Sequence, residues 1–127
     1  MFNQYVIVAG SLRNVPGRGY ALDLRIPYYR GLGLSMVDLN LEVDGARVPP
    51  ESVRFAVHGN EYALPQLGDA VDDRWGFSEA ATVTVLGEPL AAGAHEVAVV
   101  ITLRVSYMPV PSVTSIRQSV ELAATAA

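Results

Sequence analysis

Alternation between apolar and polar residues is the feature of this sequence that most constrains its fold. The stretch DLNLEVDG, residues 38–45, is the clearest case, because single acidic or amide residues separate Leu39, Leu41 and Val43. Successive side chains of a β-strand point to opposite faces of the sheet. The spacing therefore predicts a strand with one face in a core and the other in water.

Four further segments show the same alternation. The residues expected to point inward are Leu22, Leu24 and Ile26 in 20–26, Val53, Phe55 and Val57 in 52–59, Val83 and Val85 in 81–87, and Val97, Val99, Ile101, Leu103 and Val105 in 95–106. Between these segments lie stretches rich in Gly, Pro, Asn and Asp, including VPGRG at 15–19, which are typical of tight turns. We predict an all-β fold, a single-domain antiparallel β-sandwich of about seven to nine strands.

The length of 127 residues suits a single domain with one core. We expect one more strand in the apolar run from Tyr5 to Ala9, and a short helical turn within residues 63–77. Neither an internal repeat nor a low-complexity linker divides the chain. The sequence therefore predicts one sandwich domain over residues 1–122 and a frayed tail at 123–127, within the final stretch LAATAA.

Composition excludes several classes of protein. Nine arginines and no lysine against thirteen acidic residues give a net charge of −4, the wrong sign for a protein that binds phosphate backbones. With no cysteine there is no disulfide, cysteine-ligated zinc or thiol nucleophile. No apolar run approaches the roughly 20 residues of a membrane helix, and no signal peptide is evident. We therefore expect a cytoplasmic protein with neither nucleic acid nor membrane as a partner.

Residues able to carry catalysis are few. His58 and His95 belong to no metal-binding motif; a metal-ligating or basic role for His95 competes with a hydrogen bond to a turn, which we favour for each histidine. Asp69, Asp72 and Asp73 lie close together but lack the ligand spacing of a calcium loop, so a solvated loop is favoured. No serine has the surroundings of an activated nucleophile. We predict no catalytic residue and no metal site in this chain.

Aromatic and arginine side chains gather instead in three stretches that suit a binding surface. Tyrosine and arginine are enriched at the energetic centres of interfaces, because they supply contact area and hydrogen bonds together. The predicted partner interface is Tyr28, Tyr29, Arg30, Leu32, Leu34 and Met36. The second stretch, DRWGF, contributes Arg74, Trp75 and Phe77, and the third contributes Tyr107 and Met108. The competing interpretation is that Trp75 and one tyrosine only fill the end of the sandwich.

These stretches also carry a family resemblance. YYRGLGLSMV with DLNLEVDG, then DDRWGF, then LAAGAHEVAVVITLRVSYMP, in that order over residues 13–109, resemble the small β subunit of bacterial C-glycoside deglycosidases. The resemblance implies a β-sandwich paired with a larger α subunit, a TIM barrel similar to sugar-phosphate isomerases that holds a divalent metal, typically manganese. A higher-order assembly of α and β subunits is expected, with no cofactor in this chain.

The resemblance also implies a reaction, cleavage of the carbon–carbon bond between sugar and aglycone in 3-oxo-C-glucosides of polyphenols. A ketone at C3 acidifies the proton on C2, so a base can form an enediolate that a metal stabilises while the aryl carbon leaves C1. We expect this chain to cover the mouth of the α-subunit site, with Arg74 and Trp75 at the rim. The alternative is a standalone carbohydrate- or ligand-binding sandwich whose aromatic residues stack on sugar rings.

Overall fold

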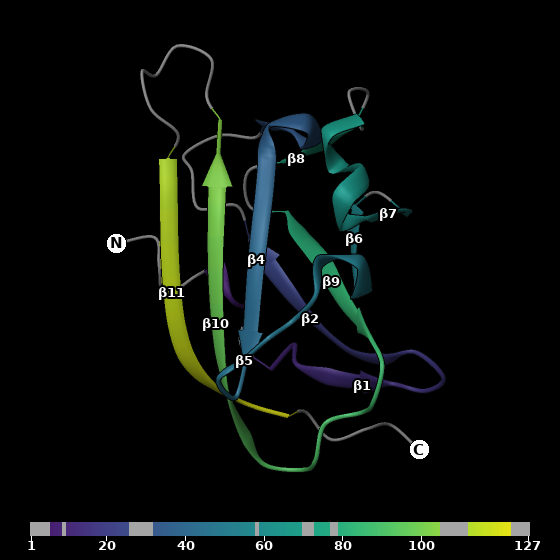
Figure 1. Ribbon diagram of the computed structural model, residues 1–127, viewed down its shortest axis with the longest axis vertical. Coiled ribbons are helices and arrows are strands. Elements are labelled where there is room, and N and C mark those ends of the chain that lie inside the picture. Colours follow the sequence, from purple (N-terminus) through teal and green to yellow (C-terminus); the bar gives the residue numbers. More distant parts are fainter. Residues whose placement is uncertain are drawn as a thin grey trace.

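Two antiparallel β-sheets lie face to face in the computed structural model (Figure 1). The structure describes residues 6–8, 10–25, 32–57, 59–69, 73–76, 79–104 and 112–122. The five-stranded sheet has the order β1 (Arg13–Val15), β2 (Gly19–Arg25), β9 (Ala80–Leu86), β6 (Val53–Val57) and β7 (Asn60–Ala63). The four-stranded sheet has the order β11 (Ser112–Glu121), β10 (Ala94–Leu103), β4 (Val37–Val43) and β5 (Ala46–Arg47). The predicted all-β sandwich is confirmed.

Burial along the strands follows the alternation of the sequence. In β4 the apolar residues are buried, while Asp38 and Asn40 are exposed and Glu42 is half-buried. Strands β6 and β10 alternate in the same way, and the inward residues of both sheets form one hydrophobic cluster. Every inward residue predicted from the alternation is buried where the structure describes it; Ile26 and Val105 lie outside the described residues.

Turn chemistry sets the register of the strands. Strands β4 and β5 are joined by Asp44 and Gly45, whose φ angles of 52° and 82° are both positive, as a two-residue hairpin of type I′ requires. The GRG sequence lies in the predicted turn between β1 and β2. At the start of β2 a side chain on Gly19 would overlap the backbone of Val85, so glycine is needed there.

Three short 3₁₀ segments lie between strands. They are η1 (Leu34–Met36), η2 (Pro50–Ser52) and η3 (Leu64–Asp69), and η3 confirms the helical turn predicted within 63–77. Of the strand predicted between Tyr5 and Ala9 the structure describes residues 6–8, which form one bridge, Ile7 to Leu24. No helix in the described ranges is long and apolar enough to cross a membrane. The predicted tail, 123–127, lies outside those ranges.

Candidate functional site

Two of the three aromatic stretches meet at one end of the sandwich. The short strands β3 (Leu32–Gly33) and β8 (Arg74–Trp75) pair antiparallel, with Leu32 opposite Trp75 and Gly33 opposite Arg74. The Leu34 amide also donates to the Asp73 carbonyl at 3.0 Å. Residues about 40 positions apart in the sequence thus form one structural unit, as expected for Arg74 and Trp75 adjoining the predicted interface.

Arg104, the first residue of the third stretch, RVSYMPVP, contacts the same end. Its amide donates to the Met36 carbonyl at 2.9 Å, and its guanidinium Nη2 donates to the Ser35 carbonyl at 2.9 Å. Arg104 therefore satisfies carbonyls of η1, which is too short to satisfy its own terminal groups. We call β3, η1, β8 and Arg104 the partner end; it lies at the top of Figure 1.

The structure places the predicted interface residues unequally. Leu34 is fully buried, while Met36 is half-buried. For Leu32 only the backbone is described, and Tyr28, Tyr29, Arg30, Phe77, Tyr107 and Met108 lie outside the described residues. Leu34 thus packs in the core and positions η1. The interface role of the stretch as a whole remains a prediction.

Trp75 and Arg74 have opposite environments although they are neighbours. The Trp75 side chain is 0% exposed, packs edge-on against Phe55 with ring centroids 5.3 Å apart, and donates from Nε1 to the Glu79 carbonyl at 3.0 Å. Arg74 is exposed. In this chain Trp75 fills the end of the sandwich, as the competing interpretation held, because the strand pairing turns its ring into the core. Of these two residues, Arg74 is the one whose side chain is exposed.

A set of hydrogen bonds around Asp73 fastens β8 to β7. The Tyr62 hydroxyl and the Asn60 amide donate to Asp73 Oδ2 at 2.7 and 3.2 Å, and the Arg74 amide donates to Oδ1 at 2.9 Å. Sequence reasoning placed Asp73 in a solvated loop and missed this role, together with that of Arg104. For Asp73 the only signal was its place directly before the Arg-Trp pair.

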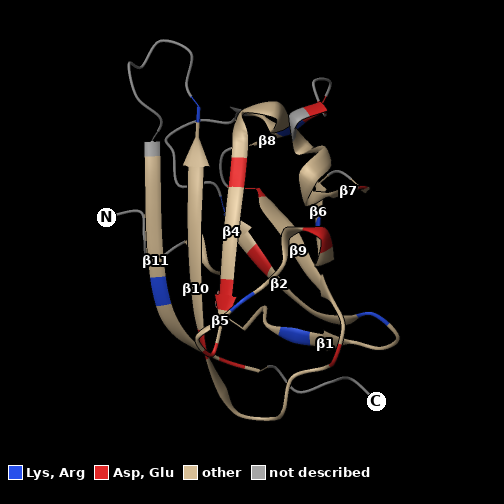
Figure 2. Ribbon diagram, in the orientation of Figure 1, with Lys and Arg blue, Asp and Glu red and all other residues tan. Residues whose placement is uncertain are grey.

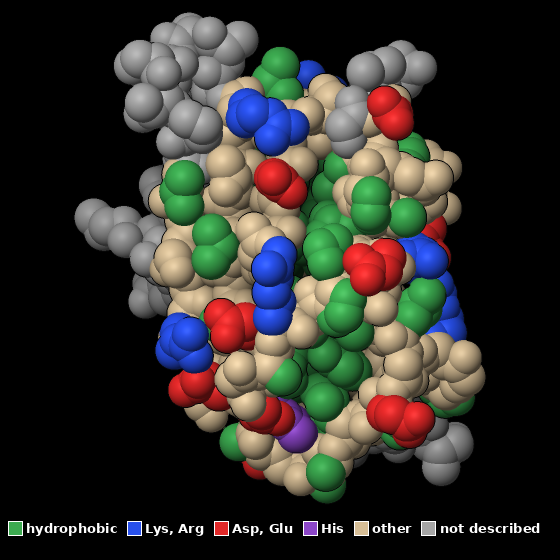
Figure 3. All heavy atoms as spheres, viewed as in Figure 1, with side chains coloured by type: hydrophobic (Ala, Val, Ile, Leu, Met, Phe, Trp, Pro, Cys, Tyr) green, Lys and Arg blue, Asp and Glu red, His purple; other side chains and the backbone are tan. Residues whose placement is uncertain are grey.

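His95 lies at the opposite end of the sandwich, beside the β4–β5 turn (the purple side chain in Figure 3). Its Nδ1 lies 2.6 Å from Asp44 Oδ2 and its Nε2 lies 2.6 Å from the Ala91 carbonyl, and the Glu96 amide donates to Asp44 Oδ1. Both ring nitrogens face acceptors, an arrangement that favours the doubly protonated, cationic form of the imidazole. We call Asp44, Gly45, Ala91 and His95 the histidine end.

These hydrogen bonds shift the pKa values of both His95 and Asp44. The bond to Asp44, then the bond to the Ala91 carbonyl, raises the pKa of His95 above its ordinary value, against the effect of partial burial. The same bond, followed by the Glu96 amide, lowers the pKa of Asp44. A cationic histidine with both nitrogens donating has no lone pair for a metal or a substrate proton. The predicted turn hydrogen bond of His95 is confirmed; His58 lies outside the described residues.

The described residues show no cluster fit to hold a metal. Within these ranges no three His, Cys, Asp or Glu side chains come together in a group that could ligate an ion. Of the predicted acidic loop, Asp69 is exposed, Asp73 is committed to Tyr62 and Asn60, and Asp72 lies outside the ranges.

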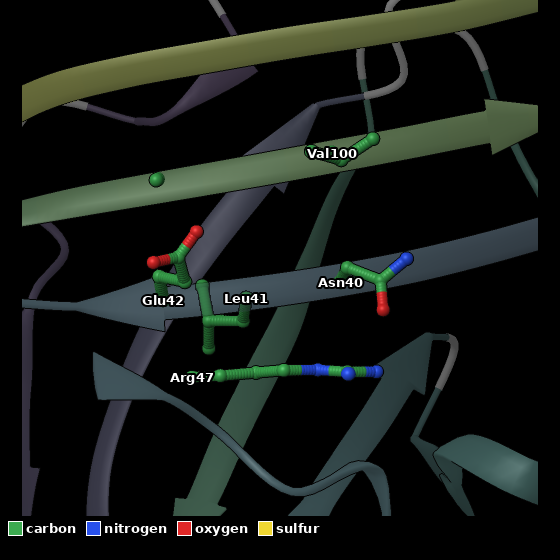
Figure 4. A pocket seen from close by; sticks show the side chains of 6 residues that line it. Asn40, Leu41, Glu42, Arg47 and Val100 are labelled. Atoms are coloured by element: carbon green, nitrogen blue, oxygen red, sulfur yellow. The ribbon is translucent and has the colours of Figure 1, made fainter. Parts of the chain in front are cut away.

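Two hollows mark the face shown in Figure 3. One, of about 370 Å³, lies on the outer face of the four-stranded sheet; Figure 4 shows the Arg47 side chain extended along β4 with its guanidinium toward Asn40. Ala98, Val100 and Glu42 complete its lining. The other, of about 260 Å³, lies between the sheets, within the band of hydrophobic side chains that runs down this face. Both suit a partner's side chain better than an enclosed substrate.

Comparison with known proteins gives one consistent result. A sequence model of the family described as "C-glycoside deglycosidase beta subunit" matches residues 2–107. The chain is 40% identical over 111 residues to the 3'-dehydrocarminate deglycosidase beta subunit of a Microbacterium species, covering 87% of this chain and 83% of that protein. It is 31% identical over 109 residues to the C-glycoside deglycosidase beta subunit of Microbacterium trichothecenolyticum, covering 85% and 82%. A third such subunit, from Arthrobacter globiformis, is 33% identical over 95 residues, 72% of each chain.

Proposed function

Because this chain belongs to the family of C-glycoside deglycosidase beta subunits, we propose that it is the noncatalytic subunit of a carbon–carbon lyase. Its partner is a TIM-barrel α subunit that holds a divalent metal, most simply manganese. The partner end of the sandwich docks on this α subunit, beside the mouth of its active site. The family match over most of the chain carries this proposal, and the pairing of β3 with β8, together with the hydrogen bonds of Arg104 to η1, supports the docking surface.

The substrate class is a C-glucoside whose sugar has been oxidised to a ketone at C3. The name of the Microbacterium relative, which specifies a 3'-dehydro glycoside, supports this class. In the α subunit the metal supplies stabilisation of the negative charge that develops when the sugar loses its C2 proton. This chain holds the active-site loops of the barrel in place and excludes water from the reacting sugar, because barrel active sites are built from loops that a neighbouring subunit can cover.

The construction of the partner end suits this role. Trp75 and Leu34 anchor it in the core, and Asp73 and Arg104 fasten its backbone through hydrogen bonds. A surface fixed in this way loses little conformational entropy on docking, so more of the contact energy remains for assembly. Arg74, exposed on β8, is the described side chain placed to reach toward the α-subunit site.

The alternative function, a standalone carbohydrate-binding module, has less support at this end. Stacking on a sugar needs an exposed aromatic face, and the indole of Trp75 is fully buried against Phe55. Tyr28 and Tyr29, which suit either role, lie outside the described residues. The two functions differ in one property: a module binds glycosides alone, and a subunit acts only with its barrel.

Reconstitution tests the proposal. The chain, its α subunit and their mixture are assayed separately for release of aglycone from a 3-oxo-C-glucoside, and each is analysed for bound metal. We expect activity from the mixture, none from this chain, and a stoichiometric metal ion only in the α subunit. Turnover by this chain alone, or an α subunit that is fully active without it, would overturn the proposal.

A further inference from the structure

The four edges of the two sheets are very unequal. Strands β1, β7 and β5 form three of them and span three, four and two residues, whereas β11 forms the fourth and spans ten. Among the described residues β11 pairs with β10 alone, along its entire length. Natural sheets protect their edges by several means, among them short strands, proline, bulges and inward-pointing charges. Within the part of the chain that the structure describes, β11 is long, contains no proline, pairs with β10 without a bulge, and has uncharged inward residues at Thr114, Ile116, Gln118 and Val120.

The outer face of β11 carries two charges of opposite sign, at Arg117 and Glu121. Arg117 is shared within the chain, with Nη1 2.6 Å from Glu96 Oε1 and Nη2 3.9 Å from Glu42 Oε2 (the basic position on β11 and the nearby acidic position on β4 in Figure 2). Glu121 makes no ion pair with any described residue. A guanidinium has five N–H donors in a planar fork, so Arg117 can donate to a further carboxylate beside that of Glu96.

We propose that β11 pairs antiparallel with β11 of a second copy of this chain, joining two four-stranded sheets across a two-fold axis at Ser119. In a two-fold contact residue i faces j and j faces i. With Ser119 opposite Ser119 of the other copy, Arg117 lies opposite Glu121 of that copy, and the same ion pair forms again on the other side of the axis. Arg117 and Glu121 are the only charged residues of β11, so no other register sets opposite charges face to face.

Neighbouring registers of the two β11 strands are less favourable because of how they place the charges. A shift of the axis to Arg117 sets two guanidinium groups opposite each other, and a shift to Gln118 sets Arg117 opposite serine and Glu121 opposite serine. Because like charges directly opposite destabilise a strand pair and opposite charges stabilise it, charge selects the axis at Ser119. The contact uses the edge of the four-stranded sheet and leaves the partner end free.

Charge reversal tests both the contact and its register on the full-length chain. In Arg117→Glu two acidic residues face each other across the axis, and in Glu121→Arg two arginines do, so each variant repels itself. An equimolar mixture of the two variants restores both opposite-charge pairs. We expect the wild-type chain to dimerise in sedimentation equilibrium, each variant to dimerise about 100-fold more weakly, and the mixture to form a heterodimer close to wild type in affinity.

Matched control variants distinguish the effect of a charge reversal on β11 from that of the same reversal elsewhere on the surface. Arg47→Glu, on the opposite edge of the same sheet, and Glu88→Arg, exposed after β9, make the same changes of charge and should leave dimerisation unchanged. Thermal unfolding reports whether Arg117→Glu folds without its intrachain pairs. A monomeric wild-type chain, variants that dimerise normally, or a mixture that stays monomeric would each overturn the proposal. So would variants that lose only α-subunit binding, since β11 would then be part of that interface.

Discussion

The two ends of the sandwich are held together by different chemistry. At the partner end, Trp75 is sealed in the core and Arg104 donates to backbone carbonyls of η1. At the histidine end, the imidazole of His95 bridges the Asp44 carboxylate and the Ala91 carbonyl. Strand β4 runs between them, from Val37 to Val43, which separates the ends by roughly 20 Å.

Because of this difference, the two ends respond differently to pH. The contacts described at the partner end depend on packing, on backbone amides, on the Asp73 carboxylate and on an arginine that stays charged at every physiological pH. The histidine end depends on a group that titrates near neutrality. The partner end, proposed to dock on the α subunit, is thus built from interactions that do not change near neutral pH. The interactions of the histidine end do change there.

The largest expected effect on stability comes from removing the buried Trp75 side chain at the partner end. Trp75→Ala removes a fully buried indole, its edge-on contact with Phe55 and its hydrogen bond to Glu79. We expect the free energy of unfolding to fall by about 3–5 kcal/mol, measured by urea denaturation. Trp75→Phe, which keeps most of the volume, should lose clearly less. A Trp75→Ala protein of unchanged stability with reduced activity would place the side chain at the site mouth after all.

A smaller effect on stability is expected when a hydrogen bond to Asp73, which fastens β8 to β7, is removed. Tyr62→Phe removes the hydroxyl that donates to Asp73 and keeps the ring, so we expect a loss of about 1–2 kcal/mol in the free energy of unfolding. Tyr20→Phe is the matched control, because the Tyr20 hydroxyl forms no hydrogen bond with any described residue, and the stability of this variant should stay close to wild type. Equal effects of the two substitutions would contradict a bracing role for Asp73.

The smallest effect is expected at the histidine end, and it depends on pH. The pKa of His95 is raised in the fold, so its contribution to stability is complete below the ordinary value of 6.5 and is lost as pH rises through the folded pKa. The pKa of Asp44 is lowered, so its contribution is complete above its ordinary value of 3.8 and is lost as pH falls through the folded pKa. The pair therefore stabilises the fold most between these two values.

Thermal unfolding at a series of pH values checks this prediction. The wild-type melting temperature should decline as pH rises above 6.5, and Asp44→Asn should flatten that decline because the imidazolium has lost its carboxylate. A decline that is the same in both proteins would show that another group causes it.

The sequence predicted the fold well where core residues alternate. Strands with buried valine, leucine and isoleucine at every second position, such as β4 and β10, were identified with their inward faces. Strand β11 was missed because Thr114 and Gln118 interrupt its inward row, leaving Ile116 and Val120 as its buried apolar residues. An edge strand covers less of the core, so its alternation is weaker and harder to detect.

The candidate site was predicted only in part. The adjacency of the interface stretch and Arg74 was anticipated, and so was the turn hydrogen bond of His95. The burial of Trp75 was left as the competing interpretation, because an aromatic residue beside arginine and glycine is equally compatible with a core and a surface. The pair of His95 with Asp44, 51 residues apart, depends on strand pairing that local sequence does not encode.

Binding to the α subunit tests most directly whether the partner end is the docking surface. Affinity is measured by sedimentation for wild type, Tyr29→Ala and Arg30→Ala, with Arg47→Ala on β5 as a control toward the histidine end, and each variant is checked for its melting temperature. Loss of about 2 kcal/mol at an interface centre corresponds to roughly 30-fold weaker binding, which we expect for Tyr29→Ala and Arg30→Ala at unchanged melting temperature, with Arg47→Ala like wild type. Normal assembly by Tyr29→Ala and Arg30→Ala, with lowered melting temperatures, would contradict the docking surface and make the stretch part of the core.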